Sequence, residues 1–264
     1  MKILFISDIV AKPGRETVKK ILPGVLEEYG PDIVIANGEN LAHGKGFSPD
    51  HIAEMREVGI DFFTAGNHVW GNSTGAEMLD DPDFPVIRPA NYPQKGVPGR
   101  GYDIVTDKEG RRLLVINLIG RVFMRNCPDC PFRAADKILE KFANEDLAGI
   151  FVDFHAETTS EKYALKFYLD GRVSAIMGTH THVPTSDAGV SEAGTAFMAD
   201  VGMVGSLDSV IGVKKEIIIE HFLTQMPVKH EPETEGKMVL NAALVTLDEK
   251  SRKALNVLHV QKFI

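Results

Sequence analysis

The sequence is poor in cysteine, in long apolar runs and in positive charge. Two cysteines in 264 residues are too few for a disulfide framework, so a reducing cytoplasm is the default location. No stretch approaches the ~20 apolar residues that a membrane-spanning helix needs. The first residues are typical of a strand and show no signal-peptide cleavage pattern. The net charge of −8 argues against an extended nucleic-acid-binding surface.

What the sequence does contain is typical of a globular protein. Hydrophobic residues make up 44% of the chain and charged residues 25%. A chain of 264 residues can bury a full core, and this one has no repeats, low-complexity segments or linkers. We therefore expect a single domain over residues 1–264.

Strands and helices alternate in the first third of the chain. Apolar runs predict strands at 2–7, 32–36 and 60–65. Apolar residues at helical spacing predict helices between these strands, at 14–29 and from Pro49 to about residue 58, the second with Ser48 as its N-cap. This βαβαβ order predicts a parallel sheet covered by helices.

The remainder of the chain mixes hairpins with further α/β units. Segments 102–106 and 112–118 are predicted to pair as a hairpin. The later predicted elements are helices at 134–145 and 159–169, strands at 149–154 and 173–177, a mostly β region after 188, and a final antiparallel pair at 237–247 and 254–263. We expect an α/β fold with two sheets and helices outside.

Polar residues follow one predicted strand after another. They are Asp8, Asn37-Gly38-Glu39-Asn40, Gly66-Asn67-His68, His155, and the pair His180 and His182. In α/β folds the ligand crevice lies at the carboxyl ends of the strands. Carboxylates, amides and imidazoles are also the side chains that bind divalent metals. Their repetition at strand ends predicts a metal site.

The segment "GTHTHVPT" places His180 and His182 one residue apart after the strand predicted at 173–177. In an extended chain, residues i and i+2 point the same way and lie about 6.6 Å apart. We therefore expect both imidazoles to face one point.

The strand-end motifs resemble those of the calcineurin-like metallophosphoesterases, which follow the pattern D-x-H, G-D-x-x-D, G-N-H-[DE], a lone His and G-H-x-H. The chain departs from this pattern with Val10, with Glu39-Asn40 and with Val69. These departures are typical of the YmdB-like phosphodiesterases. The likeness extends from "FISDIVAKPGR" through "NGEN", "TAGNHVW" and "DFHAETTSEK" to "GTHTHVPT" and "DVGMVG".

The resemblance implies a sandwich of two mixed β-sheets flanked by helices, a homo-oligomer, and two metal ions per chain. One ion would be held by Asp8, Glu39 and His182, and the other by Glu39, Asn40, Asn67, His155 and His180. By resemblance the metal is iron, although the donors also suit manganese or zinc. Two divalent ions bring four positive charges against two carboxylates, and this surplus can bind a phosphodiester and acidify a bridging water.

The mechanism that follows is attack by a metal-bridging hydroxide, with a proton given to the leaving oxygen. His68 follows Asn67 directly, so it is the candidate general acid. Asp153 and Glu157 flank His155 and are candidates for orienting the metal ligands. A solvated turn and a helix cap are the alternative roles of these two residues.

The predicted function is hydrolysis of 2′,3′-cyclic nucleoside monophosphates, such as 2′,3′-cAMP. We expect the partner to be a small-molecule phosphodiester substrate, and we expect no interaction with a membrane. A phosphomonoesterase such as a nucleotidase is one alternative. A regulatory protein that binds nucleotide or RNA and turns over slowly is another. His68 favours catalysis, because a binding protein needs no proton donor at that position.

Two features stay without an assigned role. Cys127 and Cys130 have the spacing of zinc ligands, but no second pair completes four ligands, so we interpret them as part of a loop and leave a labile disulfide open. Asp200 lies in a motif shared with the family, yet the sequence assigns its carboxylate no chemistry.

Overall fold

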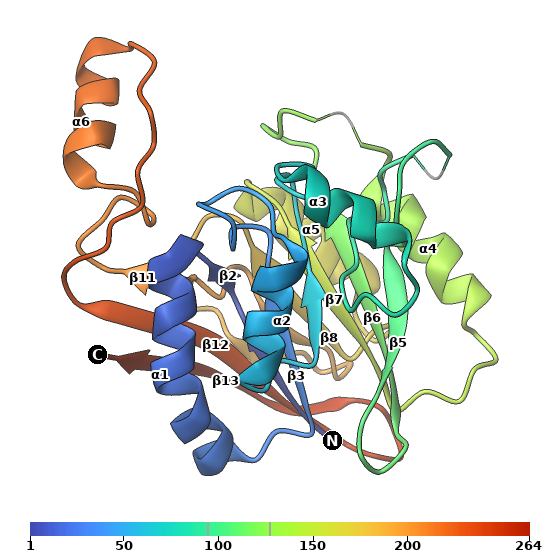
Figure 1. Cartoon of the computed structure of the whole chain (residues 1–264). Helices are drawn as coiled ribbons and strands as arrows, with labels where there is room; N and C mark the ends of the chain where they lie inside the picture. Colours follow the sequence, from blue (N-terminus) through green and yellow to red (C-terminus); the bar gives the residue numbers. More distant parts are fainter. Residues whose placement is uncertain (94, 127) are drawn as a thin grey trace.

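Two β-sheets lie face to face with helices outside them (Figure 1). This computed structural model describes residues 1–93, 95–126 and 128–264. The predicted α/β class and the sandwich of two mixed sheets are confirmed. No helix of the described residues is long and apolar enough to cross a membrane.

The first sheet contains the predicted βαβαβ unit. Its strand order is β2 (Asp8–Ile9), β11 (Met203–Ser206), β12 (Met238–Leu247), β1 (Lys2–Ile6), β3 (Ile33–Asn37) and β4 (Phe62–Thr64), with β13 (Ala254–Phe263) paired to β12. Strands β1, β3 and β4 are parallel. Strand β12 is antiparallel to β1 and to β13, which confirms the predicted final pair and makes the sheet mixed.

The second sheet begins with the predicted hairpin. Its order is β5 (Tyr102–Thr106), β6 (Arg112–Ile119), β7 (Gly149–His155), β8 (Ala175–Thr179), β10 (Ala196–Met198) and β9 (Gly189–Val190). The inner strands β6, β7, β8 and β10 are parallel, and the edge strands β5 and β9 are antiparallel to their neighbours. Parallel inner strands bring their carboxyl ends to one edge, the upper one in Figure 1.

Strand β1 is buried on both faces, which explains its continuous apolar run. Ile3 and Phe5 belong to the core between the sheets, where the ring of Phe5 lies 5.1 Å from that of Phe151. Leu4 and Ile6, one residue out of phase, belong to the core under α1 (Ala11–Tyr29) and α2 (Pro49–Glu57). The period of two in the sequence thus separates the two cores.

Helices cover the outer face of each sheet. The outer core of the second sheet includes residues of α4 (Pro131–Lys141) and α5 (Thr159–Leu169). The short α3 (Ser73–Glu77) and a following 3₁₀ turn (Met78–Asp80) lie near the upper edge. Local rules set these boundaries: the backbone N–H of His51 donates to the Ser48 hydroxyl at the start of α2, and Pro131 begins α4.

The structure differs from the sequence prediction in several elements. Helix α1 begins at Ala11 rather than at residue 14, and α3 was not predicted. Helix α6 (Lys215–Thr224) lies in the region that was predicted to be mostly β. The prediction was wrong here because Ile217-Ile218-Ile219 has the composition of a strand. Strand β8 begins and ends two residues later than predicted, since Gly178 continues the ladder. Helix α4 begins three residues earlier than predicted and ends at Lys141. Cys127 lies outside the described residues, and Cys130 is the N-cap of α4.

Two glycines of α1 provide a matched test of its backbone. A Cβ at Gly24 or at Gly30 would meet no atom within 4 Å, but Gly30 caps the helix with a left-handed φ of 56°. We expect Gly24→Ala to raise the free energy of unfolding by about 0.5–1 kcal/mol. Gly30→Ala should lower it by about 1 kcal/mol. Urea unfolding of both variants tests this, and shifts of the same sign would contradict the assigned helix end.

Candidate metal centre

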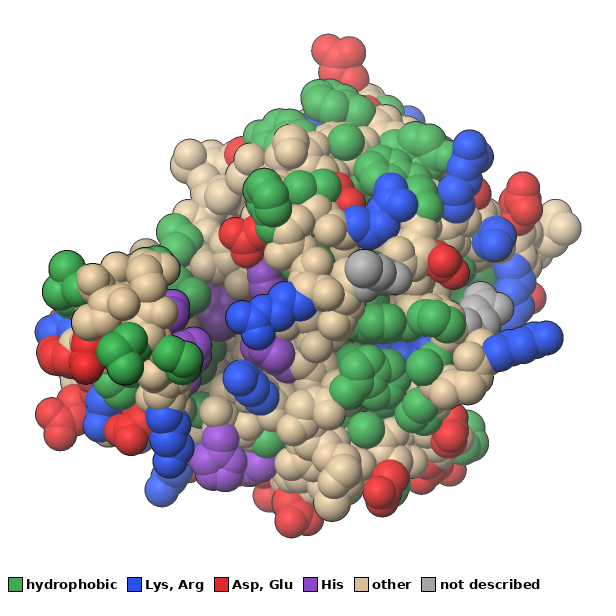
Figure 2. Space-filling view, turned by 90° about the horizontal axis from the view of Figure 1, so that it is seen from above, with side chains coloured by type: hydrophobic (Ala, Val, Ile, Leu, Met, Phe, Trp, Pro, Cys, Tyr) green, Lys and Arg blue, Asp and Glu red, His purple; other side chains and the backbone are tan. Residues whose placement is uncertain are grey.

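The carboxyl ends of the strands bring the predicted polar residues together. Asp8 is in β2, Glu39 and Asn40 follow β3, Asn67 and His68 follow β4, His155 ends β7, and His180 and His182 follow β8. Seen from above, histidine side chains gather in a recess of this face (Figure 2). The hydrogen bonds below join all eight of these residues into one network.

Glu39 is the centre of one group of donors. Its side chain is 1% exposed, and its Oε1 lies 3.2 Å from His155 Nε2. His155 Nε2 in turn lies 3.0 Å from His180 Nδ1 and 2.9 Å from Asn67 Oδ1. Glu39, His155 and His180 each offer a ligand atom within 4.8 Å of the others. One buried carboxylate and two imidazoles at this spacing could hold a transition-metal ion.

A second group of donors lies beside the first. Asp8 Oδ1 lies 3.6 Å from His182 Nε2 and accepts a hydrogen bond from Asn40 Nδ2 at 3.2 Å. Asn40 Nδ2 and His182 Nε2 are 3.3 Å apart. The other oxygen of Asp8 accepts the backbone N–H of His180 at 3.2 Å, which links the two groups.

His68 lies at the rim of this network, with a third of its side chain exposed. Its backbone N–H donates to Glu39 Oε2 at 3.0 Å, and its Nδ1 is 2.8 Å from Asn40 Oδ1. With Nδ1–H donating to that oxygen, Nε2 is left for another partner. The sequence did not indicate what orients this imidazole, and the structure assigns the task to Asn40.

Buried charges set the protonation of the two groups. Burial raises the pKa of Glu39, but the neighbouring His155 and His68 outweigh it and hold that pKa well below its usual value. Burial lowers the pKa of His182, but the carboxylate of Asp8 raises it to about 9. Burial and the positive charge on His155 lower the pKa of His180 to about 3. Protonated imidazoles thus neutralise the carboxylate charges of Asp8 and Glu39. Bound metal ions would neutralise the same charges in place of these protons.

The backbone at the histidine pair is not extended as the sequence predicted. Strand β8 ends at Thr179, and His180 and His182 have φ of 102° and 66°. His180 contacts His155 and, through Nε2 at 2.9 Å, Glu157, whereas His182 Nε2 faces Asp8. The two imidazoles therefore serve different groups. Positive φ in a residue with a side chain costs about 1–3 kcal/mol, so the surrounding structure must hold this turn.

A buried ion pair holds the turn. Lys162 Nζ of α5 donates to Asp200 Oδ2 at 2.7 Å and to the Thr179 carbonyl at 2.9 Å, and both side chains are almost fully buried. The same carboxylate oxygen accepts the backbone N–H of Thr181 at 3.0 Å and its hydroxyl at 2.8 Å. Asp200 thus has a role that the sequence did not assign. Lys162 was missed, although it ends the motif "DFHAETTSEK".

Asp153 and Glu157, predicted to orient the ligands, both contact this network. Asp153 is fully buried, and burial raises its pKa to about 7. It accepts a hydrogen bond from the Thr179 hydroxyl at 2.8 Å, and that hydroxyl lies 2.9 Å from His155 Nδ1. Close packing also limits the site, because a Cβ at Gly66 would collide with Glu39 Oε2 and His155.

The fold, the donor groups and the full-length relatives of the chain, which are named phosphodiesterases and phosphatases, together define an enzyme of the metallophosphoesterase class. A more distant solved structure, a 5′-nucleotidase precursor from Thermus thermophilus, has this fold at a TM-score of 0.61 and 14% identity, with coverage of 100% of this chain and 54% of that one. The model of the YmdB-like protein family matches residues 4–260, so the chain belongs to this family.

Full-length relatives agree with this membership. The chain is 43% identical over 257 residues to the 2′,3′-cyclic-nucleotide 2′-phosphodiesterase of Bacillus subtilis, and the match covers 97% of this chain and 95% of that protein. A hypothetical protein from Thermus thermophilus superimposes with a TM-score of 0.91 at 40% identity, over 100% and 99% of the two chains. The structure of a novel phosphatase from Mycoplasma pneumoniae superimposes with a TM-score of 0.92 at 31% sequence identity. That match covers 100% of this chain and 93% of the phosphatase.

Removing Lys162 tests whether the buried pair holds the histidine turn. Lys162→Met leaves the Asp200 carboxylate buried without its partner, so we expect a loss of about 3–5 kcal/mol in the free energy of unfolding. Lys166→Met, one turn along α5 and partly exposed, should change it by less than about 1 kcal/mol. Urea unfolding measures both, and equal losses would show that the pair has no special role.

Proposed function

We propose that the chain is a dinuclear metal-dependent phosphodiesterase that hydrolyses 2′,3′-cyclic nucleoside monophosphates, 2′,3′-cAMP among them. The observation that carries the proposal is the pair of adjacent donor groups at the strand ends, with His68 beside both. The Bacillus subtilis relative, named a 2′,3′-cyclic-nucleotide 2′-phosphodiesterase, supports it. A small-molecule phosphodiester is the proposed partner, and a cytoplasmic location and a homo-oligomer stay predictions.

The donor set fits two transition-metal ions. We assign the ions to Asp8, Glu39, Asn40, Asn67, His155, His180 and His182, with Glu39 shared. The contacts of Asn40 with His182 and Asp8 favour its placement between the two groups. Iron is our choice, and imidazole and carboxylate also suit manganese or zinc. Bound ions supply the positive charge that attracts a phosphodiester and lowers the pKa of a shared water.

His68 is the proposed general acid. Its Nδ1 is held by Asn40 and its imidazole is partly exposed, so Nε2 can meet a substrate. A protonated His68 would donate from Nε2 to the ribose oxygen that leaves the phosphorus. Such a proton transfer typically contributes ~10²–10⁴-fold to a rate.

The substrate charge favours a diester over a monoester. In the described part of the chain, no Lys or Arg hydrogen-bonds or ion-pairs with the assigned donors, and Lys162 is already paired with Asp200. The assigned donors therefore bring no Lys or Arg against the second charge of a dianionic monoester. Hydrolysis of phosphomonoesters is the second candidate function, because the similar structure from Mycoplasma pneumoniae is named a phosphatase.

Turnover of two model compounds decides between these activities. We expect kcat/KM for bis-p-nitrophenyl phosphate to exceed that for p-nitrophenyl phosphate, because the diester needs less neutralising charge. Both share one leaving group, so the comparison isolates the charge of the phosphoryl group. The opposite order by a factor of about ten or more would favour the phosphomonoesterase.

Two histidine variants separate metal binding from proton transfer. His182→Ala should lose bound metal together with activity, whereas His68→Ala should keep about two ions per chain. His68→Ala should lose ~10²-fold or more of kcat on 2′,3′-cAMP. Its loss on bis-p-nitrophenyl phosphate should be smaller, since p-nitrophenolate leaves without a proton.

Elemental analysis and kcat on both substrates provide the measurements. If His68→Ala loses metal as fully as His182→Ala, then His68 is a ligand rather than the acid. One ion per chain in fully active protein would refute the dinuclear centre.

A further inference from the structure

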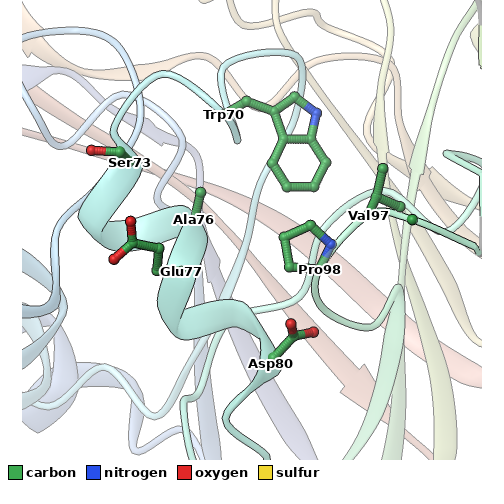
Figure 3. Close-up of a pocket in the computed structure, with 8 residues that line it drawn as sticks. Trp70, Ser73, Ala76, Glu77, Asp80, Val97 and Pro98 are labelled. Atoms are coloured by element: carbon green, nitrogen blue, oxygen red, sulfur yellow. The ribbon is translucent and has the colours of Figure 1, made fainter.

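An open cavity of about 810 Å³ lies outside the proposed metal centre. Its lining includes Trp70, Ala76, Glu77, Asp80, Val97 and Pro98. The close-up shows the Trp70 indole and the Pro98 ring beside the same space, with α3 along the other side (Figure 3). Its volume lies within the range of small-molecule sites. None of the proposed metal ligands lines it, so it has no role in the mechanism described above.

The cavity adjoins the metal centre through a tight turn. The backbone N–H of Gly71 donates to the His68 carbonyl at 2.7 Å, so Trp70 is within the turn that His68 begins. Two residues of chain span at most about 7 Å, which bounds the distance between the Cα atoms of His68 and Trp70. The wall of the cavity is therefore a near neighbour of the proposed general acid.

A second aromatic ring connects Trp70 to the site. The rings of Trp70 and Tyr92 meet edge to face, with centroids 5.7 Å apart. Burial raises the pKa of the Tyr92 phenol, a hydrogen bond from Asn126 opposes the shift, and the charge of Glu39 adds to it. Tyr92 thus lies within electrostatic reach of the proposed bridging carboxylate, and its ring is in edge-to-face contact with the Trp70 indole.

The walls and the rim of the cavity have different chemistry. The Trp70 indole and the Pro98 ring offer flat apolar surfaces on which a nucleobase can lie, and Val97 adds an aliphatic contact. Glu77 and Asp80 add carboxylates, which only accept hydrogen bonds. Asp80 Oδ1 already accepts the backbone N–H of Gly99 at 2.8 Å. Carboxylates disfavour a phosphate here and suit the exocyclic amino group of adenine, guanine or cytosine.

We propose that this cavity, the Trp70 slot, binds the base of a purine nucleotide whose phosphate lies at the metal centre. The ribose would bridge the short distance from Trp70 to His68. The inference rests on the proposed phosphodiesterase function and specifies its substrate: purine nucleoside 2′,3′-cyclic phosphates over pyrimidine ones, since a purine covers more of the indole.

The first test compares a substrate that has a base with one that has none. Trp70→Ala should raise KM for 2′,3′-cAMP about tenfold, because base–aromatic stacking contributes to binding before the chemical step. The same variant should keep its kinetics on ribose 2′,3′-cyclic phosphate, which has the reacting ring but neither a base nor an aromatic group, within about twofold, which also shows that it folds. Trp70→Phe should recover most of the loss. The matched control is Phe167→Ala, which removes an exposed aromatic side chain of α5. It should leave KM and kcat unchanged for both substrates.

The second test needs no turnover. Trp70 is the one tryptophan of the sequence, so intrinsic tryptophan fluorescence comes from the slot itself. Adenosine 2′-monophosphate should quench it with saturation, and ribose 5-phosphate should not. This measurement tests base binding independently of turnover. A protein that hydrolyses neither phosphodiester would refute the proposed function, and its fluorescence would still report whether the base binds.

Two results would overturn the slot. One is an equal change in KM for 2′,3′-cAMP and ribose 2′,3′-cyclic phosphate in Trp70→Ala. The other is tryptophan fluorescence that does not respond to adenosine 2′-monophosphate.

Discussion

Two carboxylates with almost no exposure to water, Asp8 and Glu39, impose the constraint on which the site depends. A buried charge is costly unless it is paired and hydrogen-bonded, so cationic or metal-binding groups must surround each one. His182 and His155 fill that need, and both come from the second half of the chain. The strand ends of the two sheets converge and bring these imidazoles to the carboxylates. The same crowding leaves no room for a side chain at position 66, where Gly66 stands.

The sequence predicted those parts of the molecule that follow from local pattern. Apolar runs predicted the strands of the βαβαβ unit, and Ser48 with Pro49 marked a helix start that the hydrogen bond from the His51 backbone N–H confirms. The polar residues at strand ends could be found because a parallel sheet delivers all its carboxyl ends to one edge. These residues do come together, although their roles as ligands and acid stay proposals.

What the sequence missed depends on tertiary structure. The left-handed backbone of His180 and His182 is unfavourable locally and exists because Asp200 and Lys162 hold the turn between them. A lysine in an amphipathic helix is ordinarily solvated, so its burial in α5 has no sequence pattern. Helix α6 was missed because Ile217-Ile218-Ile219 has the composition of a strand, so the local composition indicated the wrong element.

Helix α6 projects from the body of the molecule, and of its ten residues only Ile218 is buried (Figure 1). An isolated helix of this length is marginal in water, so this segment belongs to the part of the protein that opens most readily. Its amide hydrogens should exchange with solvent sooner than those of the sheets. The preceding loop supplies the Ile211 carbonyl, which lies 2.9 Å from His182 Nδ1. Fraying that spreads to this carbonyl would release one imidazole while the sheets stay folded, so the stability of this exposed segment is coupled to the geometry of the buried donor network.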